Sequence, residues 1–186
     1  MLLKNSLKVA FLGLVGFLIL VYLTAPEQVQ NKKAQEIEIS ALPEYFHVSN
    51  NDKYNYTKEL FQNDYLIVLN HDAIAVFNDL DKFTDKKIVL AANISKAPWF
   101  IKKLGVSSEI NRMYKESKFK LIFDDNGDLI KTLGLIDTAQ NSYNIYKIND
   151  NKLIFQSRAL VKRNALQEGI SKEEKTKYIN ELLNQI

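Results

Sequence analysis

The chain has 186 residues, of which 46% are hydrophobic and 25% charged, so its composition fits one globular domain with added segments. Its net charge of +3 comes from scattered lysines, with no arginine-rich or aromatic–basic run, which argues against nucleic acid as a partner. It contains no cysteine, which excludes disulfides, thiolate catalysis, iron–sulfur clusters and cysteine-bound zinc.

The N-terminus has the pattern of a membrane anchor. Val9–Leu23 carries no charge, follows Lys4 and Lys8, and reaches about 17 residues with the next two, near the lower limit for a spanning helix. A cleaved signal peptide is the alternative, but Leu23 is large where a small residue is preferred. We therefore predict an uncleaved transmembrane helix within residues 1–25. The preceding lysines place the domain outside the membrane.

The lysine, asparagine and isoleucine bias is typical of an AT-rich bacterial genome. Together with the anchor, it predicts a single-pass protein of the bacterial inner membrane. Its C-terminal domain is then in the periplasm or another extracytoplasmic space. Residues 26–63 form a polar spacer and an irregular lead-in, with one helical turn near Thr57–Phe61. The folded domain is predicted over 64–186.

The first half of this domain alternates strands and helices. Tyr65–Leu69 is an apolar run typical of a strand, and Asp72–Phe83 has helical spacing with Asp72 as its N-cap. Ile88–Ala92 is apolar without alternation, as in a strand covered on both faces. Pro98 suits the first turn of the next helix.

The following segment allows two readings. Phe119–Phe123 alternates as a strand. Asp128–Leu133 then fits a short helix closed by Gly134, but Asn126-Gly127 is also a strong hairpin signal.

The last part is clearer. Tyr143–Ile148 and Leu153–Gln156 flank a turn and predict an antiparallel hairpin. Ser171 and Glu174 form a capping box that begins an amphipathic final helix.

This order of elements resembles the thioredoxin fold over about 120 residues, from Tyr65 to Ile186. Lys87–Leu90 looks like the central strand that leads to that family's active site, and Asn126–Leu135 is similar to its short helix ending in glycine. The resemblance implies an α/β three-layer sandwich, with a mixed sheet flanked by helices. With the anchor, it points to tethered extracytoplasmic thioredoxin-like proteins, such as those that assist cytochrome maturation.

The redox residues of that family are absent. Pro98 and Ile101 stand where the family has its two cysteines, and Ala92 stands where it has a buried acid. No proline occurs in 139–142, where the family has a cis-proline before the hairpin. The resemblance therefore implies a redox-inactive domain without cofactor or metal. It would act by binding an envelope protein in an accessory or assembly role.

The resemblance also indicates a partner-binding surface, where the family grips its substrates. The candidate residues are Lys96, Pro98, Trp99, Phe100, Asn141 and Ser142. Trp99 is the only tryptophan and would be a natural anchor for a partner if it is exposed.

Two other functions remain open. A non-redox hydrolase or isomerase could use His71 with Asp72 or Asp124 as an acid–base pair, although a surface helix start, with Asp72 as its cap and His71 exposed, is the simpler explanation. A structural scaffold subunit of a membrane complex is the other alternative. A zinc site joining His47 to His71 is poorly supported, and Asp124–Asp128 lacks the spacing of an EF-hand loop.

Overall fold

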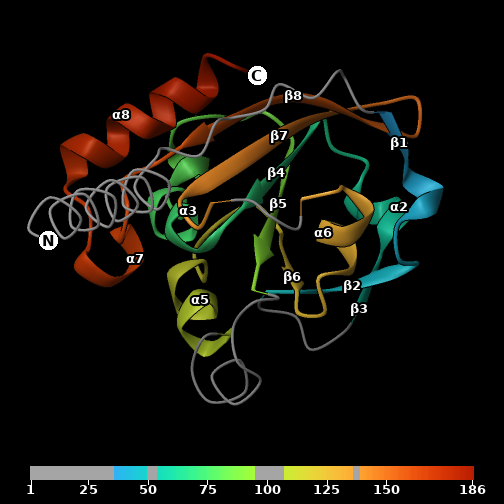
Figure 1. Ribbon diagram of the computed structural model, residues 1–186, viewed down its shortest axis with the longest axis horizontal. Helices are drawn as coiled ribbons and strands as arrows, with labels where there is room; N and C mark the ends of the chain where they lie inside the picture. Colours follow the sequence, from blue (N-terminus) through green and yellow to red (C-terminus); the bar gives the residue numbers. More distant parts are fainter. Residues whose placement is uncertain (1–35, 50–53, 95–106, 136–138) are drawn as a thin grey trace, which may run out of the picture. The chain divides into compact units, whose positions relative to one another are not determined.

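The computed structural model describes residues 36–49, 54–94, 107–135 and 139–186, which all belong to one compact unit, Asn31–Ile186. It has a mixed α/β fold built on an eight-stranded sheet with the strand order β1-β8-β7-β4-β5-β6-β2-β3 (Figure 1). The strands are β1 (Glu36–Glu38), β2 (Tyr45–Val48), β3 (Tyr54–Tyr56), β4 (Tyr65–Leu69), β5 (Ile88–Asn93), β6 (Leu121–Asp124), β7 (Ser142–Asn149) and β8 (Lys152–Leu160). The helices are α2 (Thr57–Leu60), α3 (His71–Val76), α5 (Ser107–Met113), α6 (Asp128–Thr132), α7 (Ala165–Glu168) and α8 (Lys172–Leu183), with 3-10 turns at Ile39–Ala41 and Leu80–Lys82.

Three parallel strands form the middle of the sheet. β5 lies between β4 and β6, with Leu66 opposite Val89 and Ala91 opposite Ile122. Every side chain of β5 from Ile88 to Ala92 is buried, as the unbroken apolar run predicts for a strand covered on both faces. The hairpin β7–β8 pairs with β4 through antiparallel β7.

Two hydrophobic cores lie on the two faces of this sheet. One packs Ile67, Leu69 and Leu90 against α3, α5 and α8, and the other packs Leu66, Val68 and Val89 against α2 and α6. Figure 1 shows α3 and α8 on one side of the sheet and α2 and α6 on the other. Alternation along each strand divides its side chains between the two cores.

The predicted hairpin is confirmed and is longer than predicted. β7 and β8 run from Ser142 to Leu160, with a register shift after Ile145. Asp150 and Asn151 at the turn have φ values of 48° and 61°. Positive φ at both central residues is the requirement of a tight hairpin turn, and Asp and Asn tolerate it well.

The helical reading of Asp128–Leu133 is confirmed by α6, and the rival hairpin is wrong. Gly127, with φ 74°, precedes the helix, and Gly134, with φ 65°, follows it. Asp124 also favours the helix, because its carboxylate accepts the Leu129 and Ile130 N–H groups at 3.2 and 2.9 Å. These bonds satisfy donors that every helix start leaves unpaired.

The capping box at the start of α8 is likewise confirmed. The Glu174 N–H donates to Ser171 Oγ, and the Ser171 N–H donates to Glu174 Oε2, both at 3.2 Å. Ile179 and Leu182 on the apolar side of α8 are fully buried.

Other elements differ from the sequence-based prediction. α3 ends at Val76 rather than Phe83, since the backbone leaves helical geometry at Phe77 before the 3-10 turn. The region predicted as spacer and irregular lead-in contributes β1, β2 and β3. In β2 the buried Phe46 and Val48 alternate with the more accessible Tyr45 and His47, a pattern too short to be distinctive.

Within the described ranges, no helix has the length and apolar character needed to cross a membrane. The predicted anchor in residues 1–25 lies outside these ranges.

Lys175 of α8 forms an ion pair with Asp79, which follows α3, and Lys82 bonds the same carboxylate. The hydrogen bond from Lys175 is the main reason that the pKa of Asp79 falls below its ordinary value. A lowered pKa stabilises the fold at pH above the unfolded value of 3.8, and this contribution is lost as the pH falls through the folded value.

We expect Lys175→Met to reduce the free energy of unfolding by about 0.5–1 kcal/mol at pH 7, because the pair is partly exposed. The difference from wild type should shrink as Asp79 becomes protonated below its unfolded pKa. Urea unfolding at pH 7 and pH 3 measures both. If Lys175→Met lowered the free energy of unfolding equally at the two pH values, the loss would come from packing of the lysine stem and not from the ion pair.

Candidate functional site

Polar side chains gather where the three parallel strands end. Asn70 directly follows β4, Asn93 ends β5, and Asp124 ends β6 opposite Asn93 in the register. Asn93 Nδ2 donates to Asn70 Oδ1 at 2.8 Å. Open α/β sheets form their ligand sites beyond the carboxyl ends of such strands. We therefore treat this edge as the candidate functional site.

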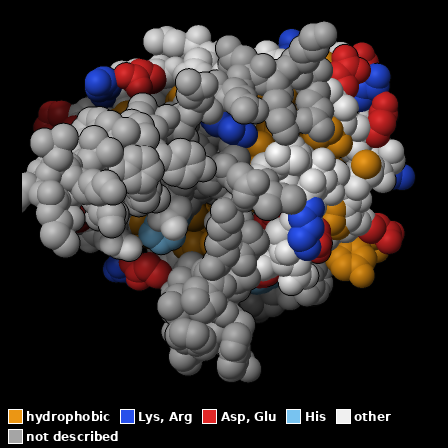
Figure 2. All heavy atoms as spheres, in the orientation of Figure 1, with side chains coloured by type: hydrophobic (Ala, Val, Ile, Leu, Met, Phe, Trp, Pro, Cys, Tyr) orange, Lys and Arg blue, Asp and Glu red, His pale blue; other side chains and the backbone are white. Residues whose placement is uncertain are grey.

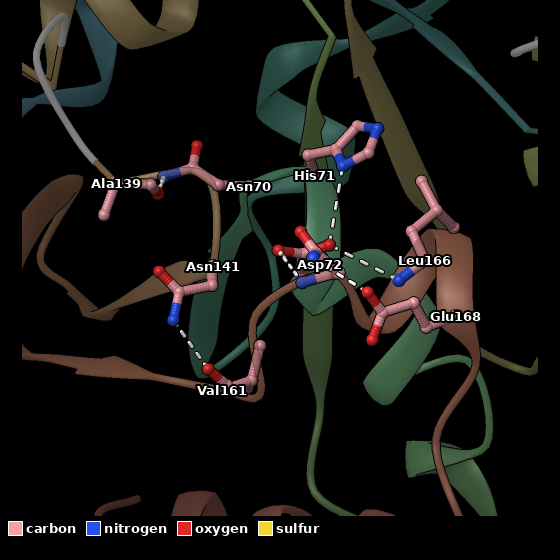
Figure 3. Close-up of polar contacts among 9 residues, drawn as sticks. Asn70, His71, Asp72, Ala139, Asn141, Val161, Leu166 and Glu168 are labelled. Atoms are coloured by element: carbon pink, nitrogen blue, oxygen red, sulfur yellow. Dashed lines mark hydrogen bonds and ion pairs between the residues drawn. The ribbon is translucent and has the colours of Figure 1, made fainter.

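Asn70 ties the segment before β7 to the start of α3. Its side chain is buried, and Nδ2 donates to the Ala139 carbonyl at 2.9 Å and to Ser142 Oγ at 2.7 Å. Main-chain bonds join the same segments, since the Asn70 N–H donates to the Ser142 carbonyl and the Asp72 N–H to the Gln140 carbonyl. Figure 3 shows Asn70 beside Ala139 at this corner. The segment 139–142 is thus fixed against the strand–helix junction of β4 and α3.

Asp72 lies at the centre of Figure 3 and has a structural role. Its side chain is buried, with Oδ2 accepting the Asn164 N–H at 3.0 Å and Oδ1 accepting the Leu166 N–H at 3.3 Å. Asn164 is the residue before α7 and has φ 58°. The carboxylate therefore caps α7, a helix distant in the sequence, and not α3 as predicted. Asn70 is the N-cap residue of α3.

His71 is adjacent to this carboxylate but faces the solvent. Its Nδ1 lies 3.5 Å from Asp72 Oδ1, and 45% of its side chain is exposed. A general base needs access to a substrate proton, which His71 has, together with a partner that orients it, which Asp72 could supply. However, backbone N–H groups already engage both oxygens of Asp72.

Asp124, the other acid of the enzymatic hypothesis, bonds α6. Burial raises its pKa, and the N–H groups of Ile130 and Leu129 act in the opposite direction. Across the described part of the chain, no hydrogen bond or ion pair joins Asp124 to His71. The structure therefore does not bring these two residues together as an acid–base pair.

His47 is placed on a different strand, β2. Its Nδ1 is 3.9 Å from Asp125 Oδ2, and its ring lies 5.3 Å from the ring of Phe123. Among the residues that the structure describes, no three His, Asp or Glu side chains are grouped as a metal site would require.

The six candidate partner-binding residues divide into two groups. Lys96, Pro98, Trp99 and Phe100 lie outside the described residues. Asn141 and Ser142 are buried, and their side chains bond within the protein. Asn141 Nδ2 donates to the Val161 carbonyl at 2.6 Å (Figure 3), and Ser142 Oγ donates to the Ala139 carbonyl at 2.9 Å.

A second polar contact was not predicted from the sequence. Asn144 of β7 is fully buried, and its Oδ1 accepts Arg158 Nε of β8 at 2.8 Å. Among the residues that the structure describes, none forms a hydrogen bond with the Asn144 Nδ2 atom. Ser142 and Asn144 share one face of β7, whereas Tyr143 and Ile145 on the other face join a hydrophobic core. That alternation of polar and apolar residues was the available signal for a polar row.

The arrangement holds main-chain segments together more than it presents reactive groups. Asn70, Asp72 and Asp124 each bond backbone groups of a segment that is separate in the sequence or begins a new helix. A comparison with models of known protein families gives no match, and a comparison with curated proteins also gives none.

Proposed function

We propose that this chain is a membrane-anchored, extracytoplasmic, thioredoxin-like protein without redox activity, which acts by binding another envelope protein. Its role would be accessory or in assembly. The sequence supplies the anchor pattern and the lack of sulfur chemistry. The mixed sheet with helices on both faces is compatible with the resemblance.

The main support for this proposal is the way in which polar side chains at the β4–α3 corner bond to the main chain. Enzymes place reactive groups at such a corner, but here Asn70, Asp72 and Ser142 bond main-chain groups of 139–142 and of the start of α7. Because these polar groups hold the backbone, the corner is better suited to a rigid surface than to proton transfer. Rigid surfaces lose little entropy when they bind a partner.

The strand order also refines the resemblance. In the thioredoxin family, the segment before the hairpin and the strand–helix junction that carries the cysteines share one surface. If the same holds here, the junction that corresponds to the cysteine site is the one that residues 139–142 contact. That junction is Leu69–Ala73, one β–α unit earlier than the sequence comparison placed it. Asn70 and Ala73 then stand at the spacing of the missing cysteines. Lys96–Phe100 follow the neighbouring strand β5 and remain candidates for the same sheet edge.

The test is site-specific photo-crosslinking of the full chain in native membranes. We expect a photo-reactive residue at position 99 or 100 to give one discrete adduct with an envelope protein. As a control, a variant that carries the photo-reactive residue at position 177 in place of Lys177, which is exposed on α8, should not give this adduct. A crosslinker at position 99 combined with Phe100→Ala should reduce the yield at least fivefold, because truncating a central aromatic anchor costs about 1–2 kcal/mol.

Two results would contradict the proposal. Crosslinking that is equally weak and diffuse at positions 99, 100 and 177 would contradict the proposal that this surface binds a specific partner. Release of the full chain from membranes by an alkaline wash would contradict the predicted transmembrane anchor.

A further inference from the structure

The two outer strands of the described sheet differ in charge. β1 carries Glu36 and Glu38, and Lys152 of β8 lies 3.1 and 3.6 Å from their carboxylates. Charged side chains on an edge strand discourage pairing with another chain. β3, at the opposite edge, has the uncharged sequence Tyr54-Asn55-Tyr56. Only the β1 edge therefore has this protection.

The main chain of β3 presents hydrogen-bonding groups at this edge. The Thr57 N–H donates to the Glu44 carbonyl at 2.9 Å, and hydrogen-bonded pairs alternate along an antiparallel ladder. The next bonded pair is therefore Asn55 with Phe46, two positions along the register. The Tyr54 N–H and C=O and the Tyr56 N–H then point away from the sheet.

Two tyrosines flank this edge on one face. Tyr45 and Tyr56 are opposite each other in the register of β2 and β3, and the two residues are 51% and 57% exposed. In Figure 2, hydrophobic side chains reach the surface at the lower right, in the region of β2 and β3 in Figure 1. Tyrosine offers a large apolar surface at low entropic cost, which makes it frequent among the residues that dominate binding.

We propose that the β3 edge binds an extended, uncharged segment of a partner protein as an added strand. The segment pairs with the outward main-chain groups of Tyr54 and Tyr56, while the Tyr56 ring covers a side chain of the segment and Tyr45, one strand further in, extends the same exposed face. A charged segment would lose solvation at this edge without gaining an opposite charge within β3. This inference rests on the proposed function and specifies how the partner is held.

A second copy of the chain is the less suitable occupant. β3 has three residues, and pairing two such strands buries far less than the roughly 1,200 Å² that stable interfaces require. An extended segment of a partner needs only a transient interaction and no matching folded surface.

The test compares Tyr56→Pro with Tyr56→Ala in the full chain held in detergent micelles. Both variants lack the ring, but only proline removes the outward N–H. Tyr56 has φ −66°, which proline adopts without strain, and Asn55 before it is in a strand, as proline requires. The probe is a labelled ten-residue peptide of alternating threonine and valine with one lysine at each end. A copy with alternate backbone N–H groups methylated is its control.

We expect fluorescence anisotropy to show binding to wild type and weaker binding to Tyr56→Ala. Binding to Tyr56→Pro should be about three- to tenfold weaker again, the range for one hydrogen bond. The methylated peptide should bind no protein. Equal affinity for the two variants, or for the two peptides, would overturn the inference. So would dimerisation of the chain through β3 in place of peptide binding.

The peptide comparison on wild type decides the question even if Tyr56→Pro fails to fold. The outcome is separable from the proposed function. If Tyr56→Pro weakens peptide binding as expected and leaves the adduct at position 99 unchanged, the protein has two separate binding surfaces. If the unmethylated peptide does not bind and the adduct at position 99 persists, only the inference that β3 binds an added strand is contradicted.

Discussion

Asn70→Ala is expected to lower the free energy of unfolding by about 2–4 kcal/mol. The substitution removes three hydrogen bonds of a buried side chain: to the Ala139 carbonyl, to Ser142 Oγ and from Asn93 Nδ2. Each intramolecular hydrogen bond contributes about 0.5–1.5 kcal/mol net, and three are lost together here. Urea unfolding measures the loss. Hydrogen exchange should also become faster in 139–142, because this segment loses its side-chain tie to α3.

Two further variants test the cause. Asn70→Asp keeps the size of the side chain but turns a carboxylate oxygen toward the Ala139 carbonyl, so we expect a comparable loss. Asn149→Ala removes an exposed asparagine that bonds Asp150, and it should change stability by less than about 0.5 kcal/mol. A neutral effect of Asn70→Ala would mean that the network forms no part of the stable fold.

The elements of the fold with strong local signals were predictable. The turn residues Asp150 and Asn151, the capping box at Ser171 and the apolar run of β5 each specify one structure locally. The order of strands was not predictable in this way. Which strand β7 joins depends on side chains from segments far apart, and Asn70 contacts Ser142 across 72 positions.

The same limit applies to the candidate site. The sequence drew attention to His71 and Asp72 because they are adjacent, and an Asp at a helix start usually caps its own helix. Asp72 instead accepts N–H groups from residues 92 and 94 positions later. Local pattern reasoning cannot find such a partner, and it gave no sign of the Asn70–Asn93 contact. Short strands such as β1 and β3 are also missed, because three residues are too few to show a period.

The second large effect is expected for Asp72→Ala, which should reduce the free energy of unfolding by about 2–4 kcal/mol. It leaves the N–H groups of Asn164 and Leu166 without their acceptor. Hydrogen bonds to a charged group contribute about 1.5–3 kcal/mol each, and loss of a helix cap alone costs about 1 kcal/mol. Asp72→Asn keeps one acceptor oxygen and should lose about half as much. Urea unfolding measures both, and hydrogen exchange should increase in α7.

His71→Ala is the matched control, and it separates the two readings of this corner. Nearly half of the His71 side chain is solvent-exposed, so a structural Asp72 predicts a change of less than about 0.5 kcal/mol for His71→Ala. An acid–base pair predicts the reverse pattern. Catalytic groups cost stability in order to be held in place, so their removal tends to leave the fold intact or strengthen it. If both variants proved stable, Asp72 would have no structural role and the enzymatic hypothesis would regain its basis. A large loss confined to Asp72 would instead assign the carboxylate to the attachment of α7.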